Sequence, residues 1–436
     1  MSQDPPATEV ALSIDHLFRH RAGQMIAVLT RSLGIEHLEL VEDAVQDAMV
    51  KALHRWPYHG VPDNPTAWIV RVAKNRALDR LRRHSTWQRK EQALVHSLSK
   101  LPSGESEVFF SPEVRDDQLR MIFFCCHPSL SRDSQVALTL KLAGGFGTHE
   151  LAHAFLVKPS TMAQRLVRAK RTLRRRSVDL TWPEPSALPA RLDAALETLY
   201  LMFNEGYGAA EGDELVRLDL CREAIRLVLL LAEHPRIGTP KVDALAALLL
   251  FQGARLATRA DASGDLLLMS AQDRSLWDRD LLRQAALFLA RSASGEKLSG
   301  YHLEAEIAAC HALAADYEST DWRRILDCYD ALHERNPSPV VAVNRLVAVL
   351  KVDGATAALE QIDNLIEEKA LDRYYPAHAI HAEILASAGK TDAAIEALRR
   401  AIDLGVSAPV KRHLERRISE ERGQVQIEQI ESGTSG

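Results

Sequence analysis

The sequence predicts an all-α protein built from several helical domains. Apolar residues recur at three- and four-residue spacing along nearly the whole chain, which is the period of an amphipathic helix. Aromatic residues make up only 6% of the composition, and the alternating β-branched pattern typical of strands is scarce. Because 436 residues exceed what one ordinary core accommodates, we expect two to four domains.

Helix signals are clearest in the first half of the chain. The predicted helices cover 13–33, 37–56, 65–92, 113–126, 131–142, 148–156, 160–177, 189–204 and 213–233. Stretches rich in Ser, Pro and Gly interrupt this pattern at 97–112 and again at 179–188. These breaks predict two domains at 1–96 and 113–178 with a linker at 97–112. A helical extension at 189–300, repeats at 301–420 and a polar, disordered tail at 421–436 follow.

The net charge of −5 is unevenly distributed. Residues 1–180 carry 26 Lys and Arg against 19 Asp and Glu, a net charge of +7, whereas the remainder carries 28 against 40, a net charge of −12. A basic front half suits a polyanionic partner. The five cysteines lack metal-type spacing, so we expect apolar fillers in a reduced protein. No run of about 18 apolar residues and no secretory signal is present, which predicts a cytoplasmic protein.

A repeat is visible late in the chain. Gly354 and Gly389 lie 35 residues apart, and each precedes an Ala-rich helix. One period earlier lies the segment TDWRRILDCYDALHERNP, which ends at Pro337. Paired helices with a period near 34 residues resemble tetratricopeptide repeats. A plain helical bundle with accidental spacing is the alternative.

The segment 148–176 predicts two helices joined by a short turn, because Pro159 ends the first helix and Ser160 or Thr161 begins the second. On the second helix the apolar side chains form one stripe: Met162, Leu166, Ala169 and Leu173. The opposite side carries polar and basic side chains: Thr161, Gln164, Arg165, Arg168, Arg171 and Arg175. Seven basic residues and no acid lie between Pro159 and Arg176, which favours phosphate binding over a merely solvated face. Gln164 and Arg165 are placed to reach base edges in a major groove.

A second basic helix is predicted within 63–90. One side suits a core: Ile69, Val70, Ala73, Ala77 and Leu81. The far side carries Trp68, Arg71, Asn75 and Arg82, an aromatic among cations that suits a strand with unstacked bases. An ordinary core role for Trp68 is the alternative.

Upstream, an acidic and polar ridge is predicted on the outer side of a helix. It comprises Glu42, Asp43, Gln46 and Asp47. The inner side is small or apolar: Val41, Ala44, Val45, Ala48 and Met49. Such a ridge suits a basic protein surface, and a solvated helix face is the alternative.

These segments together resemble a known family. VEDAVQDAMVKAL and NPTAWIVRVAKNRALDRLRR resemble sigma region two of extracytoplasmic-function sigma factors, and QVALTLKLAGGFGTHELAHAFLVKPSTMAQRLVRAKRTLRR resembles their region four. LYLMFNEGYGA at 199–209 and QDRSLWDRDLL at 272–282 resemble the extension of a subgroup that carries tetratricopeptide-like repeats after region four. The resemblance therefore reaches nearly the whole chain.

The resemblance implies roles for individual residues. Asp43, Gln46 and Asp47 match positions that dock on the β′ clamp helices of core RNA polymerase, and region four would meet the β flap. The positions that contact the minus-ten element in this family are matched here by Trp68, Arg71, Asn75, Arg82 and Arg83. The loop 57–65 matches the family's loop that receives a flipped base. The positions that contact the minus-thirty-five element are matched by Ser160, Thr161, Gln164, Arg165, Arg168 and Arg171.

The implied protein is a sigma factor, not an enzyme, with promoter DNA and core polymerase as partners and no cofactor, metal or membrane. The repeats would regulate or support activity by binding a regulatory protein or peptide. NEGYG at 204–208 and the segment around Arg274 and Trp277 are candidate contact points, with a helix-end turn and a core tryptophan as alternatives. Two rival functions remain: a helix-turn-helix regulator that acts without polymerase, and a repeat scaffold for protein interactions.

Overall fold

The computed structural model describes residues 22–83, 112–207 and 217–433, apart from short gaps at 156, 262, 367–370 and 372–373. Within these ranges the regular structure is helical, as predicted, and the one β interaction is an isolated bridge between Ala260 and Leu266. The chain divides into two compact units, 1–201 and 202–436. Residues 97–111 of the predicted linker lie outside the described residues.

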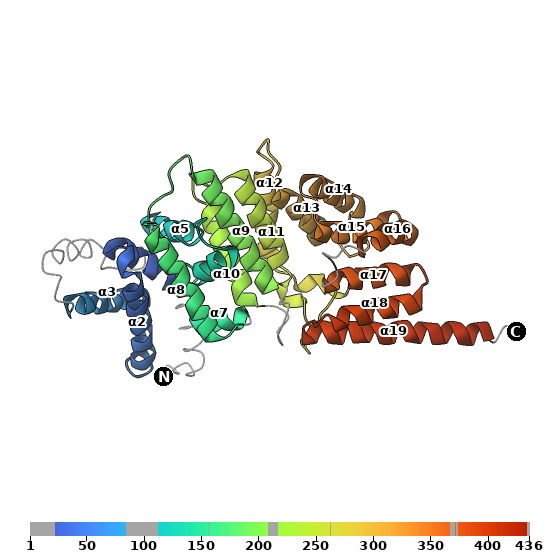
Figure 1. Ribbon diagram of the computed structural model, residues 1–436, viewed down its shortest axis with the longest axis horizontal. Helices are drawn as coiled ribbons and strands as arrows, with labels where there is room; N and C mark the ends of the chain where they lie inside the picture. The colour runs from blue at the N-terminus through green and yellow to red at the C-terminus, as the bar shows by residue number, and fades with distance from the viewer. Residues whose placement is uncertain are drawn as a thin grey trace, which may run out of the picture. The chain divides into compact units, whose positions relative to one another are not determined.

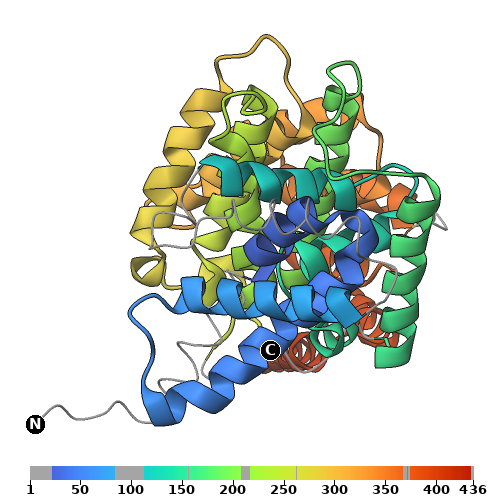
Figure 2. The same ribbon diagram turned by 90° about the vertical axis from the view of Figure 1, so that its left-hand side faces the viewer.

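The first unit begins with a helix over 22–33, followed by the short 3-10 helix η1 (Ile35–His37), α2 (Leu38–His59) and α3 (Pro65–Arg83). Helices α2 and α3 pack on each other and are joined by the turn at 60–64 (Figure 2). Asn64 begins α3, because its side-chain oxygen accepts a 3.0 Å hydrogen bond from the amide of Ala67. The predicted inner faces are confirmed in the main: Val41, Ala44, Val45, Ala48, Ile69, Ala73, Ala77 and Leu81 are buried.

Four more helices complete most of the first unit: α5 (Pro112–Cys125), α6 (Arg132–Leu142), α7 (Thr148–Ala154) and α8 (Pro159–Arg175). The helix over 22–33 approaches the end of α6 closely. A Cβ atom built on Gly23 would lie 2.0 Å from the backbone oxygen of Ala143, so this approach requires glycine. That same oxygen accepts a 3.2 Å hydrogen bond from the buried Gln118 side chain.

Helix α9 (Leu188–Tyr207) contains the boundary between the two units. The second unit then continues with α10 (Leu218–Ala232), α11 (Pro240–Gly253), α12 (Arg279–Ser292) and α13 (Gly300–Leu313). Helix α11 is apolar on nearly all sides, and it packs against the other three helices.

Three short 3-10 helices lie between α11 and α12: η3 (Leu256–Thr258), η4 (Met269–Ala271) and η5 (Arg274–Leu276). Trp277, just after η5, is only 3% exposed. Its ring nitrogen donates a 3.0 Å hydrogen bond to the hydroxyl of Thr258. Trp277 is therefore a core residue, which decides between the two alternatives that the sequence left open for it.

The rest of the second unit is a succession of helices, each packed on the next (Figure 1). They are α14 (Trp322–Arg335), α15 (Pro339–Val352), α16 (Ala355–Ile366), α17 (Tyr375–Ser387), α18 (Thr391–Asp403) and α19 (Ala408–Gly433). Gly354 and Gly389 follow α15 and α17 with φ values of 88° and 71°. The glycine recurs because this left-handed conformation ends a helix at little cost only without a side chain.

Helix α19 differs from the expected disordered tail, because its backbone remains helical to Gly433. The sequence after residue 421 is polar, but its Glu, Gln, Arg and Ile residues are compatible with a helix and no proline interrupts them.

The five cysteines are free thiols, four of them buried and Cys310 half-buried. Burial raises the pKa of Cys221 to about 12, so this thiol stays protonated. These positions agree with the predicted role of cysteine as an apolar filler. None of the described helices is both long and apolar enough to cross a lipid bilayer.

Candidate nucleic-acid interface

Helix α8 carries its buried apolar side chains on one side and mostly polar side chains on the other, where Val167 is 55% exposed. The four residues predicted to face inward, Met162, Leu166, Ala169 and Leu173, are its buried residues. Pro159 occupies the first turn, where its missing amide hydrogen costs nothing. Most of the predicted contact residues are exposed: Ser160, Thr161, Gln164, Arg168 and Arg171. The preceding helix α7 packs against α8 across a short connection at 155–158.

Arg165 is the exception on this helix. Its guanidinium group lies 5.9 Å from the ring centroid of Phe155, and Nη1 lies 3.7 Å from the Asp133 carboxylate. The side chain is consequently only 25% exposed. Arg165 was expected to contact DNA from α8, and its side chain would have to leave Phe155 and Asp133 in order to reach a base.

Helix α3 brings Trp68, Arg71 and Asn75 to one side. Arg71 and Asn75 are exposed, whereas Trp68 is half-buried. The Trp68 ring meets Trp56 edge to face, with 5.6 Å between ring centroids. Trp68 thus has a core contact and an accessible part at the same time. Arg82 and Arg83 end α3, and their side chains lie outside the described residues.

The ridge on α2 is held by an arginine that the sequence did not single out. Nη1 of Arg80 lies 2.8 Å from Oδ2 of Asp43, and Nη2 lies 2.9 Å from Oδ2 of Asp47. Both carboxylates remain substantially solvent-exposed, at 64% and 40%, and Gln46 is exposed beside them. Arg80 therefore fixes the positions of two acids and leaves them accessible.

Glu42 does not share this exposed position, although we expected it on the outer ridge. Its carboxylate lies 2.7 Å from Nζ of Lys170 on α8, and the two side chains are only 10% and 12% exposed. No periodicity predicts this pair, because 128 residues separate its members.

Comparison with known proteins now bears on these surfaces. Residues 17–86 match sigma-70 region 2, and residues 191–293 match a family of unknown function (DUF6596). This match supports a factor of the sigma-70 family. An uncharacterized protein of Rhizobium meliloti (strain 1021) is 39% identical over 378 residues, which cover 85% of this chain and 88% of that protein. This chain belongs to one family with that relative, and the similarity is longer than either compact unit, so it extends into both.

The residues that match region 2 include the helix over 22–33, α2 and α3. Among the described residues, three ion pairs join them to the helices that follow in the first unit. Besides the Glu42–Lys170 pair, Arg174 on α8 lies 3.7 Å from Glu39, and Arg31 lies 2.7 Å from the buried Asp117 on α5. Burial raises the pKa of Asp117, although Arg31 and Arg120 act in the opposite direction. Region 2 is thus held against α5 and α8.

Proposed function

We propose that the chain is a sigma factor of the extracytoplasmic-function type, which binds core RNA polymerase and directs promoter recognition, melting and initiation. The observation that carries the proposal is the presence of two different surfaces on the paired region 2 helices. Helix α2 exposes Asp43, Gln46 and Asp47, whereas α3 exposes Arg71 and Asn75 next to the half-buried Trp68. A repressor that reads duplex DNA needs neither a protein-docking acidic ridge nor an aromatic among cations.

The α3 surface would bind the melted strand of the minus-ten element. Arg71, with Arg82 and Arg83 farther along the helix, would hold the backbone, while the accessible part of Trp68 stacks against a base. Such stacking contributes roughly 1–3 kcal/mol per base. The predicted loop 57–65 is shorter in the structure, where α2 runs to His59 and the connection covers 60–64. Tyr58, in the last turn of α2, is 84% exposed and offers a second ring beside this loop. A flipped base received by this loop would meet that ring.

Helix α8 would read the minus-thirty-five element in the major groove as the second helix of a helix-turn-helix. Ser160, Thr161 and Gln164 lie in its first two turns, the part of a recognition helix that reaches base edges. Arg168 and Arg171, farther along, suit phosphate contacts. Counterion release would then supply much of the affinity, so binding should weaken steeply as salt increases.

The acidic ridge of α2 would dock on the β′ clamp helices, and the domain that contains α8 would meet the β flap. Promoter elements 25 base pairs apart are separated by about 85 Å of duplex at 3.4 Å per base pair. Region 2 and α8 cannot reach both elements while Glu42 and Lys170 hold them together at 2.7 Å. We therefore propose that polymerase binding breaks the ion pairs between them.

The extension would regulate or support this activity. Helices α15 to α18 form two successive pairs with a glycine at the same place in each, which supports the tetratricopeptide-like interpretation. Stacked helix pairs of this kind offer a concave surface to a regulatory protein or peptide. The proposed function requires no catalysis, cofactor or metal from this chain, and it belongs in the cytoplasm with the polymerase.

In vitro transcription tests the proposal. The purified full-length chain and core polymerase are incubated with fragmented genomic DNA from the source organism, and the 5′ ends of the transcripts are sequenced. We expect initiation at a small set of sites that share spaced minus-ten and minus-thirty-five sequences. Specific binding of duplex DNA without any polymerase-dependent initiation would instead support a regulator that acts alone. Failure to bind either polymerase or DNA would favour a scaffold.

A further inference from the structure

A cavity of about 620 Å³ lies in the second unit, among residues of α13, α14, α15, α17, α18 and α19. Its volume is within the range of roughly 300–1,000 Å³ typical of small-molecule sites. Aliphatic side chains and four aromatic ones, Tyr317, Trp322, Tyr329 and Tyr375, line most of it. Nothing in the proposed initiation function uses this cavity.

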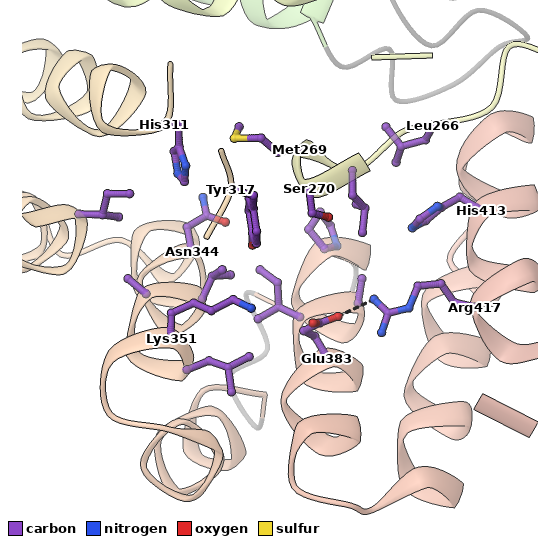
Figure 3. A pocket seen from close by; sticks show the side chains of 18 of the residues that line it. Leu266, Met269, Ser270, His311, Tyr317, Asn344, Lys351, Glu383, His413 and Arg417 are labelled. Atoms are coloured by element: carbon purple, nitrogen blue, oxygen red, sulfur yellow. Dashed lines mark hydrogen bonds and ion pairs between the residues drawn. The ribbon is translucent and has the colours of Figure 1, made fainter. Parts of the chain in front are cut away.

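One side of the cavity is closed by the segment 266–270, which runs between the helices (Figure 3). The segment is anchored at its start, because Asp265 forms an ion pair with Arg412 on α19 and Leu266 packs into the apolar cluster of α17 to α19. An open groove along stacked helix pairs suits an extended peptide. A cavity with an anchored wall suits a compact ligand instead.

The polar groups of the cavity define the charge of that ligand. Glu383 and Arg417 point toward each other and form a 2.5 Å ion pair, so their charges compensate (Figure 3). The Lys351 side chain also points into the cavity, with Nζ 5.5 Å from the Tyr317 ring centroid (Figure 3). Among the described residues, no carboxylate lies within 4.0 Å of that ammonium group. Glu318 also lines the cavity, and both it and Lys351 are exposed. Lys351 thus points into the cavity without a direct carboxylate partner among the described residues.

Two histidine rings, those of His311 and His413, also line the cavity. Nδ1 of His311 and Nδ1 of His413 line or adjoin the cavity and have no hydrogen-bond partner among the described residues. Burial lowers the pKa of both side chains, to about 4 for His311, so both rings are neutral near pH 7. Both nitrogens are buried from solvent, and the neutral rings add no positive charge to the cavity.

We propose that this cavity binds a small organic anion, with an apolar, preferably aromatic body against the tyrosine and tryptophan rings and one acidic group against Lys351. A hydrogen bond between two ionised groups is about twice as strong as one between neutral groups, so an acidic group on the ligand would pair with Lys351. The ligand would bridge α15, α17 and α19, and its binding would therefore stabilise the repeats.

A dye with this chemistry tests the proposal. Anilinonaphthalene sulfonate has an aromatic body and one sulfonate, and phenylnaphthylamine has the same rings without the charge. Each is titrated into the full-length protein near pH 7, and the fluorescence increase is followed. We expect saturable binding of both dyes at one site and a higher melting temperature in the presence of the sulfonate.

Substitution of Lys351 separates charge recognition from apolar binding. Lys351→Gln should weaken binding of the sulfonate about tenfold, because it removes a hydrogen bond to an ionised group, and leave the neutral dye unaffected. Lys297→Gln is the matched control, because Lys297 is exposed in the same unit and does not line the cavity. Equal affinity of the Lys351 variant and the control for the sulfonate would overturn the assignment of Lys351.

Filling the cavity tests the location. Ser270→Trp places a large ring in the cavity from an exposed position, so the fold should tolerate it, and Ala379→Phe fills the cavity from α17. Each variant should lose binding of both dyes while its unfolding transition remains cooperative. A folded Ser270→Trp variant that binds both dyes with unchanged affinity would show that they bind elsewhere, and the proposal would be wrong.

Discussion

The acidic ridge on α2 gives the most direct test of polymerase docking. Asp43 and Asp47 on α2 each form an ion pair with Arg80 on α3. The double substitution of Asp43→Ala and Asp47→Ala therefore removes two possible functions at once: docking on polymerase and the connection of α2 to α3. The three side chains are 38–64% exposed. Pairs that exposed contribute little, so the double substitution should lower the free energy of unfolding by only about 1 kcal/mol.

Loss of docking would be much larger. Truncation of one side of a buried interfacial charge pair costs about 2–5 kcal/mol, and the lower value already weakens affinity about 30-fold. A fluorescently labelled chain titrated with core polymerase measures this affinity by anisotropy, and urea unfolding measures stability in parallel. We expect the double variant to lose at least about 30-fold in affinity with little loss of stability.

Arg80→Gln is the matched control for this experiment. It breaks the same two ion pairs and leaves both carboxylates in place, so it should show the same small loss of stability and nearly unchanged affinity for core polymerase. An affinity loss of equal size in Arg80→Gln would mean that helix pairing, not docking, explains the result. Unaltered affinity in the double variant would refute the docking assignment outright.

Three further predictions concern the fold. Lys170→Met leaves the buried Glu42 carboxylate without its partner and should lower the free energy of unfolding by about 3 kcal/mol, as measured by urea titration. Adding Glu42→Gln to this variant should restore most of the lost stability. Equal losses in the single and the double variant would argue against a buried pair. Burial and two nearby guanidinium groups lower the pKa of His311 to about 4. The unfolded chain takes up this proton at a higher pH, so stability should fall by up to about 3 kcal/mol as the pH drops from 6.5 to 4. His311→Gln should flatten that slope, and an unchanged slope would contradict the assignment. Gly23→Ala should lower the free energy of unfolding by about 1–3 kcal/mol, because its methyl group meets the backbone oxygen at the end of α6. Gly423→Ala, in open space on α19, should raise that free energy by up to about 1 kcal/mol. Similar melting temperatures for the two variants would count against the close approach.

The sequence alone determined the features that depend on local periodicity. The inward stripe of α8 was predicted residue by residue, since four positions at three- and four-residue spacing must share one side of any helix. The exposure of Gln164, Arg168 and Arg171 followed from the same geometry. Helix ends were also predictable near Pro159 and Gly354, because proline and glycine restrict or extend the backbone locally.

Only the tertiary structure decided which faces meet. Periodicity places Glu42 on the outer side of α2, but Lys170 reaches it from a helix 128 residues away and buries it. Arg165 was expected to be free and lies against Phe155, because a long side chain can choose among several neighbours. The cavity around Lys351 is lined by residues of six helices, and no single helix carries its pattern. Contacts between segments far apart in the chain depend on how whole helices pack, and that is set by all the side chains at once.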